Sequence, residues 1–92
     1  MSRFVAVDHE SRVRHRIAAH LGLPAEVIAP ERELDRDLGL DAFDLALVAL
    51  KLEGELSLDF PLALLDSIRT VGDFAKLVEH LDRVARHLPK AG

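Results

Sequence analysis

Three stretches of the sequence carry apolar residues at every third or fourth position, which is the spacing of one face of an α-helix. They run over about 8–21, 41–55 and 70–88. Gly22 follows the first stretch and Pro89 ends the third, and these residue types commonly mark the C-terminal ends of helices. No segment alternates cleanly between apolar and polar residues, as a half-buried strand would. The pattern therefore predicts an all-α protein.

Each predicted helix has a capping residue and an apolar side. Asp8, Asp41 and Thr70 are the expected N-caps, and Asp44 would complete a capping box with Asp41. A long loop precedes the second helix, and a short helix is expected after Pro61. The apolar residues expected to face the core are Val13, Ile17, Ala18 and Leu21 in the first helix, Val27, Ile28, Leu34 and Leu38 in the loop, Leu45, Val48, Ala49, Leu52 and Leu56 in the second helix, and Val71, Phe74, Leu77, Val78, Leu81, Val84 and Leu88 in the last. They would meet in one core that extends over about residues 8–88.

The composition limits the classes of protein to which the chain can belong. Ninety-two residues fit one domain, 1–92, and the absence of cysteine suits the cytoplasm. No apolar run reaches the roughly 18 residues of a membrane span, and the first residues lack the apolar core of a secretion signal. The formal net charge of −4 argues against nucleic-acid binding, which needs clustered lysine and arginine. We therefore expect a cytoplasmic globular protein.

The segment at residues 37–44 reads DLGLDAFD and resembles the D-L-G-x-D-S-[LF]-D segment of acyl carrier proteins. The residues shared with that pattern, here called the motif frame, are Asp37, Leu38, Gly39, Asp41 and Asp44. Further matches occur at residues 21–23, 60–61 and 68–71, with no insertion from residue 12 to about residue 81. The resemblance implies an acyl-carrier-protein-like four-helix bundle with three long helices and one short helix.

Ala42 stands where the resemblance places the family's attachment serine. In acyl carrier proteins that hydroxyl is esterified by 4'-phosphopantetheine, whose thiol holds the acyl chain. Alanine has no oxygen to esterify, so we expect no cofactor on this chain. Ser67 follows Asp66 in the one other Asp-Ser pair, but no D-L-G precedes it, and it is interpreted as an ordinary loop serine.

The second predicted helix has two apolar faces, although a surface helix needs only one. The face opposite the core carries Phe43, Ala46, Leu47 and Leu50, with Glu53 at its border and Leu62 nearby in the sequence. The resemblance implies that this face meets partner enzymes, and Leu47 stands where the family often has a glutamate. An apolar patch of this kind also suits a homodimer. Alternatively, the N-terminal arm or the short helix folds over it.

Other chemistry finds little support in the sequence. The five histidines do not form a metal-binding pair with helical spacing, and there is no cysteine, so no metal site is expected and the histidines are interpreted as solvated. There is no nucleophile elbow and no phosphate-binding glycine loop. We therefore expect a protein that is not an enzyme.

Two functions remain open. In the first, the chain is an acyl-carrier-like, non-catalytic protein that is not phosphopantetheinylated and docks on a biosynthetic enzyme through its second helix. In the second, it is a genuine acyl or aminoacyl carrier of fatty-acid, polyketide or related biosynthesis, and Ala42 replaces its attachment serine. The codon for residue 42 in the source gene would discriminate between them.

Overall fold

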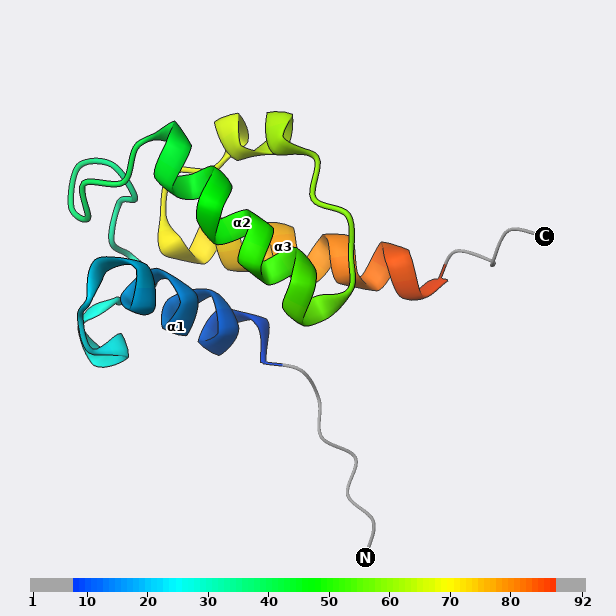
Figure 1. Ribbon diagram of the computed structural model, residues 1–92, viewed down its shortest axis with the longest axis horizontal. Coiled ribbons are helices and arrows are strands. Elements are labelled where there is room, and N and C mark those ends of the chain that lie inside the picture. Colours follow the sequence, from blue (N-terminus) through cyan, green and yellow to red (C-terminus); the bar gives the residue numbers. More distant parts are fainter. Residues whose placement is uncertain (1–7, 88–92) are drawn as a thin grey trace, which may run out of the picture.

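The computed structural model describes residues 8–87 of the chain, without the side chain of residue 87. These residues form three α-helices and two short 3₁₀ helices, which in chain order are α1 (His9–Leu21), η1 (Ala25–Val27), α2 (Ala42–Leu56), η2 (Leu62–Ser67) and α3 (Val71–His87). Figure 1 shows how they are arranged. Within residues 8–87 there is no strand, and the only extended pairing is an isolated bridge between Glu33 and Thr70. The all-α prediction, with three long helices and a short one after Pro61, is confirmed.

The predicted caps of α1 and α3 fix where these helices begin. The Asp8 carboxylate accepts a hydrogen bond from the Ser11 N–H at 3.1 Å. At α3, the Thr70 hydroxyl accepts from the Asp73 N–H at 3.0 Å, and the Asp73 carboxylate accepts from the Thr70 N–H at 3.1 Å. Both caps satisfy backbone donors that have no partner inside a helix. Gly22 ends α1 in the left-handed conformation with φ of 70°, which glycine adopts without strain.

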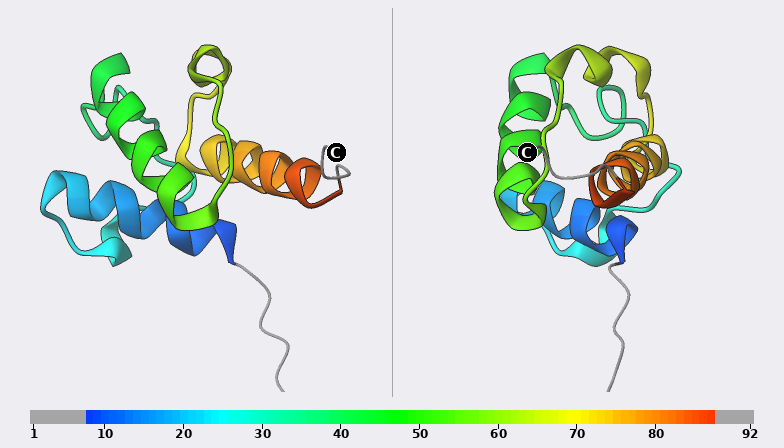
Figure 2. Two further views of the ribbon diagram at one scale, coloured as in Figure 1. Left: turned by 45° about the vertical axis from the view of Figure 1, so that its right-hand side comes forward. Right: turned by 90° about the vertical axis from the view of Figure 1, so that its right-hand side faces the viewer.

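The core lies between four elements that surround it. The right panel of Figure 2 shows α1, α2, η2 and α3 on four sides of a common interior. Phe60 and Phe74 meet there edge to face, with ring centroids 5.8 Å apart. The other buried apolar side chains are Val13, Ile17, Ala18, Ile28, Leu34, Leu40, Leu45, Val48, Ala49, Leu52, Leu58, Leu65, Val71, Ala75 and Val78.

Two of the predicted core positions are wrong. Val84 is exposed, because the C-terminal end of α3 extends past the end of α2 (Figure 1). Val27 is also exposed, because the chain turns at η1 so that Ile28 fills the core position instead. The partly buried side chains of Leu21, Leu38, Leu56, Leu77 and Leu81 pack against the core at its border. The predicted positions Leu88 and Pro89 lie outside the described residues.

The long loop before α2 is tied to the start of α3 by three backbone hydrogen bonds. The Leu34 N–H donates to the Arg69 carbonyl at 2.8 Å, the Val71 N–H donates to the Arg32 carbonyl at 3.0 Å, and the Gly72 N–H donates to a loop carbonyl at 2.9 Å. These bonds satisfy polar groups that would otherwise be costly to bury. They also hold the start of α2 at a fixed place in the fold.

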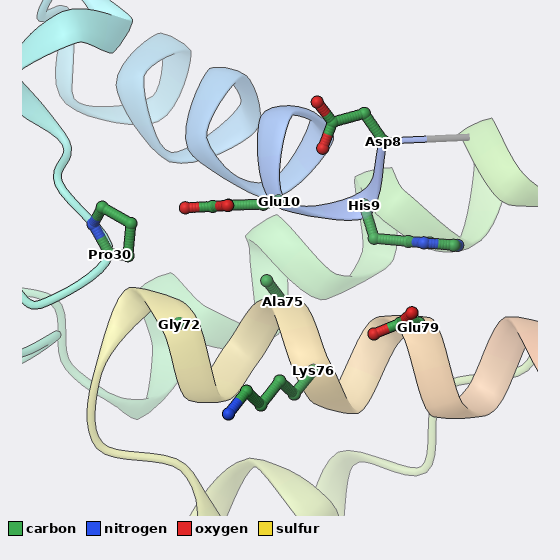
Figure 3. Close-up of a pocket in the computed structure, with 8 residues that line it drawn as sticks. All are labelled: Asp8, His9, Glu10, Pro30, Gly72, Ala75, Lys76 and Glu79. Carbon is green, nitrogen blue, oxygen red and sulfur yellow. The ribbon is translucent and has the colours of Figure 1, made fainter. Parts of the chain in front are cut away.

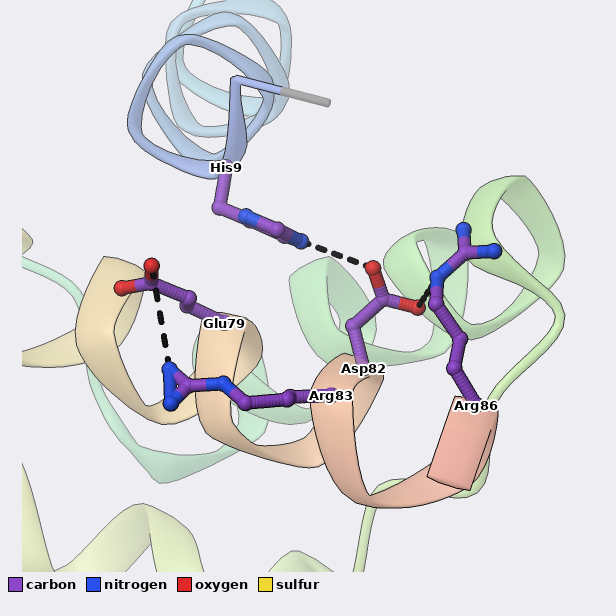
Figure 4. Close-up of polar contacts among 5 residues, drawn as sticks. All are labelled: His9, Glu79, Asp82, Arg83 and Arg86. Carbon is purple, nitrogen blue, oxygen red and sulfur yellow. Dashed lines mark hydrogen bonds and ion pairs between the residues drawn. The ribbon is translucent and has the colours of Figure 1, made fainter. Parts of the chain in front are cut away.

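A polar cluster joins the first turn of α1 to the C-terminal half of α3 (Figure 4). His9 Nε2 lies 2.8 Å from Asp82 Oδ2, and Arg86 Nε lies 3.2 Å from Asp82 Oδ1. Asp82 is only 4% exposed. Burial alone would raise the pKa of Asp82, but the bonds from His9 and Arg86 outweigh it and hold that pKa below its ordinary value. The prediction of a solvated His9 is therefore wrong.

Candidate functional site

The motif frame begins with a tight turn that places residue 40 in the core. The Asp37 carboxylate accepts a hydrogen bond from the Glu33 N–H at 2.8 Å, and the Leu40 N–H donates to the Leu34 carbonyl at 2.9 Å. Gly39 has φ of 68°, and a Cβ there would meet no atom within 4 Å. The positive φ, rather than crowding, therefore accounts for glycine at this position. The turn leads directly into α2.

The start of α2 is held by a complete capping box, as predicted. The Asp41 carboxylate accepts from the Asp44 N–H at 2.8 Å, and the Asp44 carboxylate accepts from the Asp41 N–H at 3.0 Å. His20 of α1 adds a contact from its Nε2 to Asp44 Oδ1 at 2.9 Å. The Asp41 N–H, and then His20, hold the pKa of Asp44 below its ordinary value. His20 is exposed, as predicted for a surface histidine, and it also makes this contact with α2.

Ala42 is the first residue of α2 and is exposed. Its methyl group lies at the wall of an open depression of about 500 Å³ between the motif frame and the segment before α3. The other residues around the depression are Leu34, Asp35, Gly39, Leu40, Asp41, Leu45, Ile68 and Arg69. None of these described side chains carries a hydroxyl or a thiol. The depression therefore offers no hydroxyl that could be esterified.

Ser67 lies at the end of η2 and is used locally. Its hydroxyl donates to the Leu64 carbonyl at 2.6 Å, which closes the last turn of the 3₁₀ helix. Ser67 was predicted to be an ordinary loop serine, but it is the last residue of this 3₁₀ helix.

The face of α2 opposite the core is apolar and open. Phe43 is 70% exposed, Leu50 is 62% exposed and Leu62 of η2 is 56% exposed. Leu47 is also exposed, whereas Ala46 is half-buried and packs against the core. The exposed side chains Phe43, Leu47, Leu50 and Leu62 are here called the apolar stripe. Since these side chains are exposed, η2 does not cover the stripe, and the N-terminal arm lies outside the described residues.

Another depression, of about 390 Å³, lies between the start of α1 and the first turns of α3 (Figure 3). Three carboxylates border it, from Asp8, Glu10 and Glu79, together with the ammonium of Lys76. Figure 3 shows that the side chains of Glu10 and His9 point in opposite directions along this depression. Across residues 8–87, no three metal-ligating side chains are close enough to hold an ion. None of the described helices is long and apolar enough to cross a membrane.

The comparisons with known proteins agree with this geometry. Residues 11–78 match the family described as phosphopantetheine attachment site. The chain belongs to the acyl carrier protein family. It is 40% identical over 75 residues to an acyl carrier protein of Saccharopolyspora erythraea, and the aligned residues cover 82% of this chain and 77% of that protein. It is 35% identical over 72 residues to an acyl carrier protein of Sinorhizobium fredii, and the aligned residues cover 78% of this chain and 92% of that protein.

Two residues near the start of α2 escaped the sequence reasoning about an acyl-carrier-like site. His20 touches Asp44 from another helix, and Arg69 borders the depression beside Ala42. Both lie more than 20 positions from the motif frame residue that they approach. Their placement depends on how the helices pack, so no local pattern in the sequence could have signalled it.

Proposed function

We propose that this member of the acyl carrier protein family is a non-catalytic docking protein that is not phosphopantetheinylated and that binds a biosynthetic enzyme through the outer face of α2. The observation that carries the proposal is the pairing of Ala42 with the apolar stripe. The position that needs a nucleophile has a methyl group, while the neighbouring face that would meet a partner is exposed and apolar.

The motif frame can persist without attachment chemistry, because its residues build the start of α2. Asp37 closes the turn, Gly39 supplies the positive φ, and Asp41 and Asp44 cap the helix. Losing an N-cap costs about 1 kcal/mol. Stability alone therefore gives a reason to keep these residues after the serine is gone.

Docking through the apolar stripe is favoured on energetic grounds. Burying a leucine or phenylalanine side chain contributes roughly 1.5–3 kcal/mol, whereas an exposed ion pair contributes roughly 0–1 kcal/mol. Two anchors such as Phe43 and Leu50 would thus outweigh several surface charges. The same stripe would also serve a homodimer, which is the competing occupant.

The attachment half of the proposal is tested by intact mass. The chain is incubated with coenzyme A and a broad-specificity phosphopantetheinyl transferase, beside a carrier protein that retains its serine as the positive control. We expect the control to gain one phosphopantetheine unit and this chain to gain nothing. A gain on this chain would overturn the proposal.

The docking half is tested with Leu47→Glu and Leu50→Glu. Both residues are exposed, so the variants should keep the helicity and the unfolding midpoint of the wild type in circular dichroism. Any self-association of the wild type, measured by sedimentation, should be lost if a homodimer occupies the stripe. Unfolded variants would show that the stripe belongs to the core and that the partner face lies elsewhere.

The second candidate function is a genuine carrier whose serine was replaced. The complete capping box and the open depression around Ala42 favour it, because nothing in the described surroundings obstructs a hydroxyl at this position. A serine codon at position 42 of the source gene would establish this alternative, and an alanine codon would exclude it.

A further inference from the structure

The acidic side chains of α2 are all bound within the protein. Glu53, which the sequence placed at the border of the partner face, is half-buried, and its carboxylate accepts the Phe60 N–H at 2.7 Å. The Glu55 carboxylate is held by Arg12 at 3.5 Å and by Arg16 of α1. The third acid, Asp44 in the first turn of α2, belongs to the capping box and also contacts α1. Each of the three carboxylates therefore already has a partner within the protein.

Lys51 is the one basic residue of α2, and its situation is the opposite. It is exposed, and within residues 8–87 it makes no hydrogen bond or ion pair. Helical geometry places Lys51 about 40° from Leu47 around the axis of α2, at the edge of the apolar stripe that faces α1. At the edge of the stripe that faces α1, the charge without a partner in residues 8–87 is thus positive.

A small depression of about 280 Å³ extends the stripe across the seam between α1 and α2. Ala19, Leu47 and Val48 give it apolar walls, and Lys51 lies at its border. Arg16 and His20 of α1 complete the lining, each already bound to an acid of α2. The seam depression therefore combines an apolar interior with a cationic border.

We propose that the partner presents an apolar side chain flanked by a carboxylate, with the apolar side chain entering the seam depression beside Leu47 and the carboxylate meeting Lys51. This inference rests on the proposed docking function and specifies the chemistry of the partner. A basic partner surface would meet an unpaired ammonium and find the acids of α2 already engaged. Since an exposed ion pair adds little affinity, Lys51 sets the orientation and the choice of partner more than the strength of binding.

The test uses two synthetic amphipathic helical peptides with the same apolar face, flanked by glutamate in one and by lysine in the other. Their affinities are measured by fluorescence anisotropy at low salt. We expect the glutamate peptide to bind about two- to fivefold more tightly, which is the range of one exposed ion pair. Lys51→Glu should remove or reverse this preference. Lys76→Glu, the same change of charge on α3, is the matched control and should leave it unchanged.

The outcomes separate the inference from the docking function on which it rests. If both peptides bind and Leu47→Glu or Leu50→Glu abolishes binding, but the lysine peptide binds equally well or better, only the inference about charge is overturned. If neither peptide binds, or if folded variants at both leucines still bind them unchanged, the docking face itself is overturned. A dimer that is abolished by the leucine variants and that excludes both peptides would make a second copy the occupant, which also overturns the inference.

Discussion

Histidine–aspartate contacts occur at both ends of α1, and they differ in burial more than in geometry. In the first turn, His9 approaches Asp82 of α3 at 2.8 Å, and in the last turn, His20 approaches Asp44 of α2 at 2.9 Å. The side chain of Asp82 is 6% exposed and that of Asp44 is 29% exposed. Because water screens charges and competes for hydrogen bonds, the buried contact should contribute much more to stability. Distance alone does not rank the two contacts.

The hydrogen-bond partners of each aspartate lead to the same ranking of the two contacts. Asp82 bonds His9 and Arg86 through different carboxylate oxygens, so its removal leaves a largely buried imidazole without its acceptor. The donors of Asp44 are the Asp41 N–H and His20, which lie near the surface. Water can therefore replace Asp44 more readily than Asp82. We interpret the His9–Asp82 contact, here called the clamp, as one that holds α1 against α3. The His20–Asp44 contact adds only a little stability at the start of α2.

The largest expected effect comes from Asp82→Ala. Leaving a buried partner unsatisfied costs about 1–3 kcal/mol, and bonds to charged groups lie toward the upper end, so we expect a loss of about 2–3 kcal/mol in the free energy of unfolding. Asp44→Ala should cost clearly less. Urea denaturation of the wild type and both variants measures the difference. Equal losses would contradict the ranking by burial.

A double-mutant cycle isolates the contact from the rest of the side chain. The coupling energy between His9→Ala and Asp82→Ala should be well above experimental error, because each variant removes the same buried bond. Additive losses would show that Asp82 acts through Arg86 rather than through His9.

Acid should weaken the clamp in a defined direction. Folding lowers the pKa of Asp82 below its ordinary value of 3.8, so its ionised form stabilises the folded protein. This contribution is complete above that ordinary value and is lost as the pH falls through the folded pKa. Asp82→Asn should therefore make stability less dependent on pH between about pH 5 and pH 3, measured by thermal unfolding.

The structure also shows which features a sequence can predict. The capping box of Asp41 and Asp44 and the cap at Thr70 follow from residues three apart, so local pattern suffices. The part of the apolar stripe that lies on α2 follows from helical periodicity, whereas the position of Leu62 beside it depends on where η2 packs. By contrast, His9 and Asp82 are 73 positions apart, and whether they meet depends on the packing of α1 on α3. Val84 was misplaced for a related reason, because periodicity tells which side a residue faces but not how far the neighbouring helices extend.

A smaller effect is expected from His20→Ala. The contact with Asp44 is partly exposed, and such contacts contribute about 0–1 kcal/mol. At a pH low enough to protonate the imidazole, the loss should shrink as salt is added, because screening then weakens the pair in the wild type. His9→Ala, as the comparison, should lose more stability and respond less to salt. Chemical denaturation of both variants with urea, at low and high salt, checks the difference.

The smallest effect on stability is expected from Ala42→Ser, which nevertheless has the largest consequence for chemistry. Residue 42 is exposed at the first position of α2, between the two members of the capping box, so the added hydroxyl should change the free energy of unfolding by about a few tenths of a kcal/mol. We expect a broad-specificity phosphopantetheinyl transferase to modify the variant, seen as a gain of one phosphopantetheine unit in intact mass. The wild type is the matched control, because it keeps Ser67 and the same fold. A folded Ala42→Ser that the transferase ignores would show that the motif frame now serves only to start the helix.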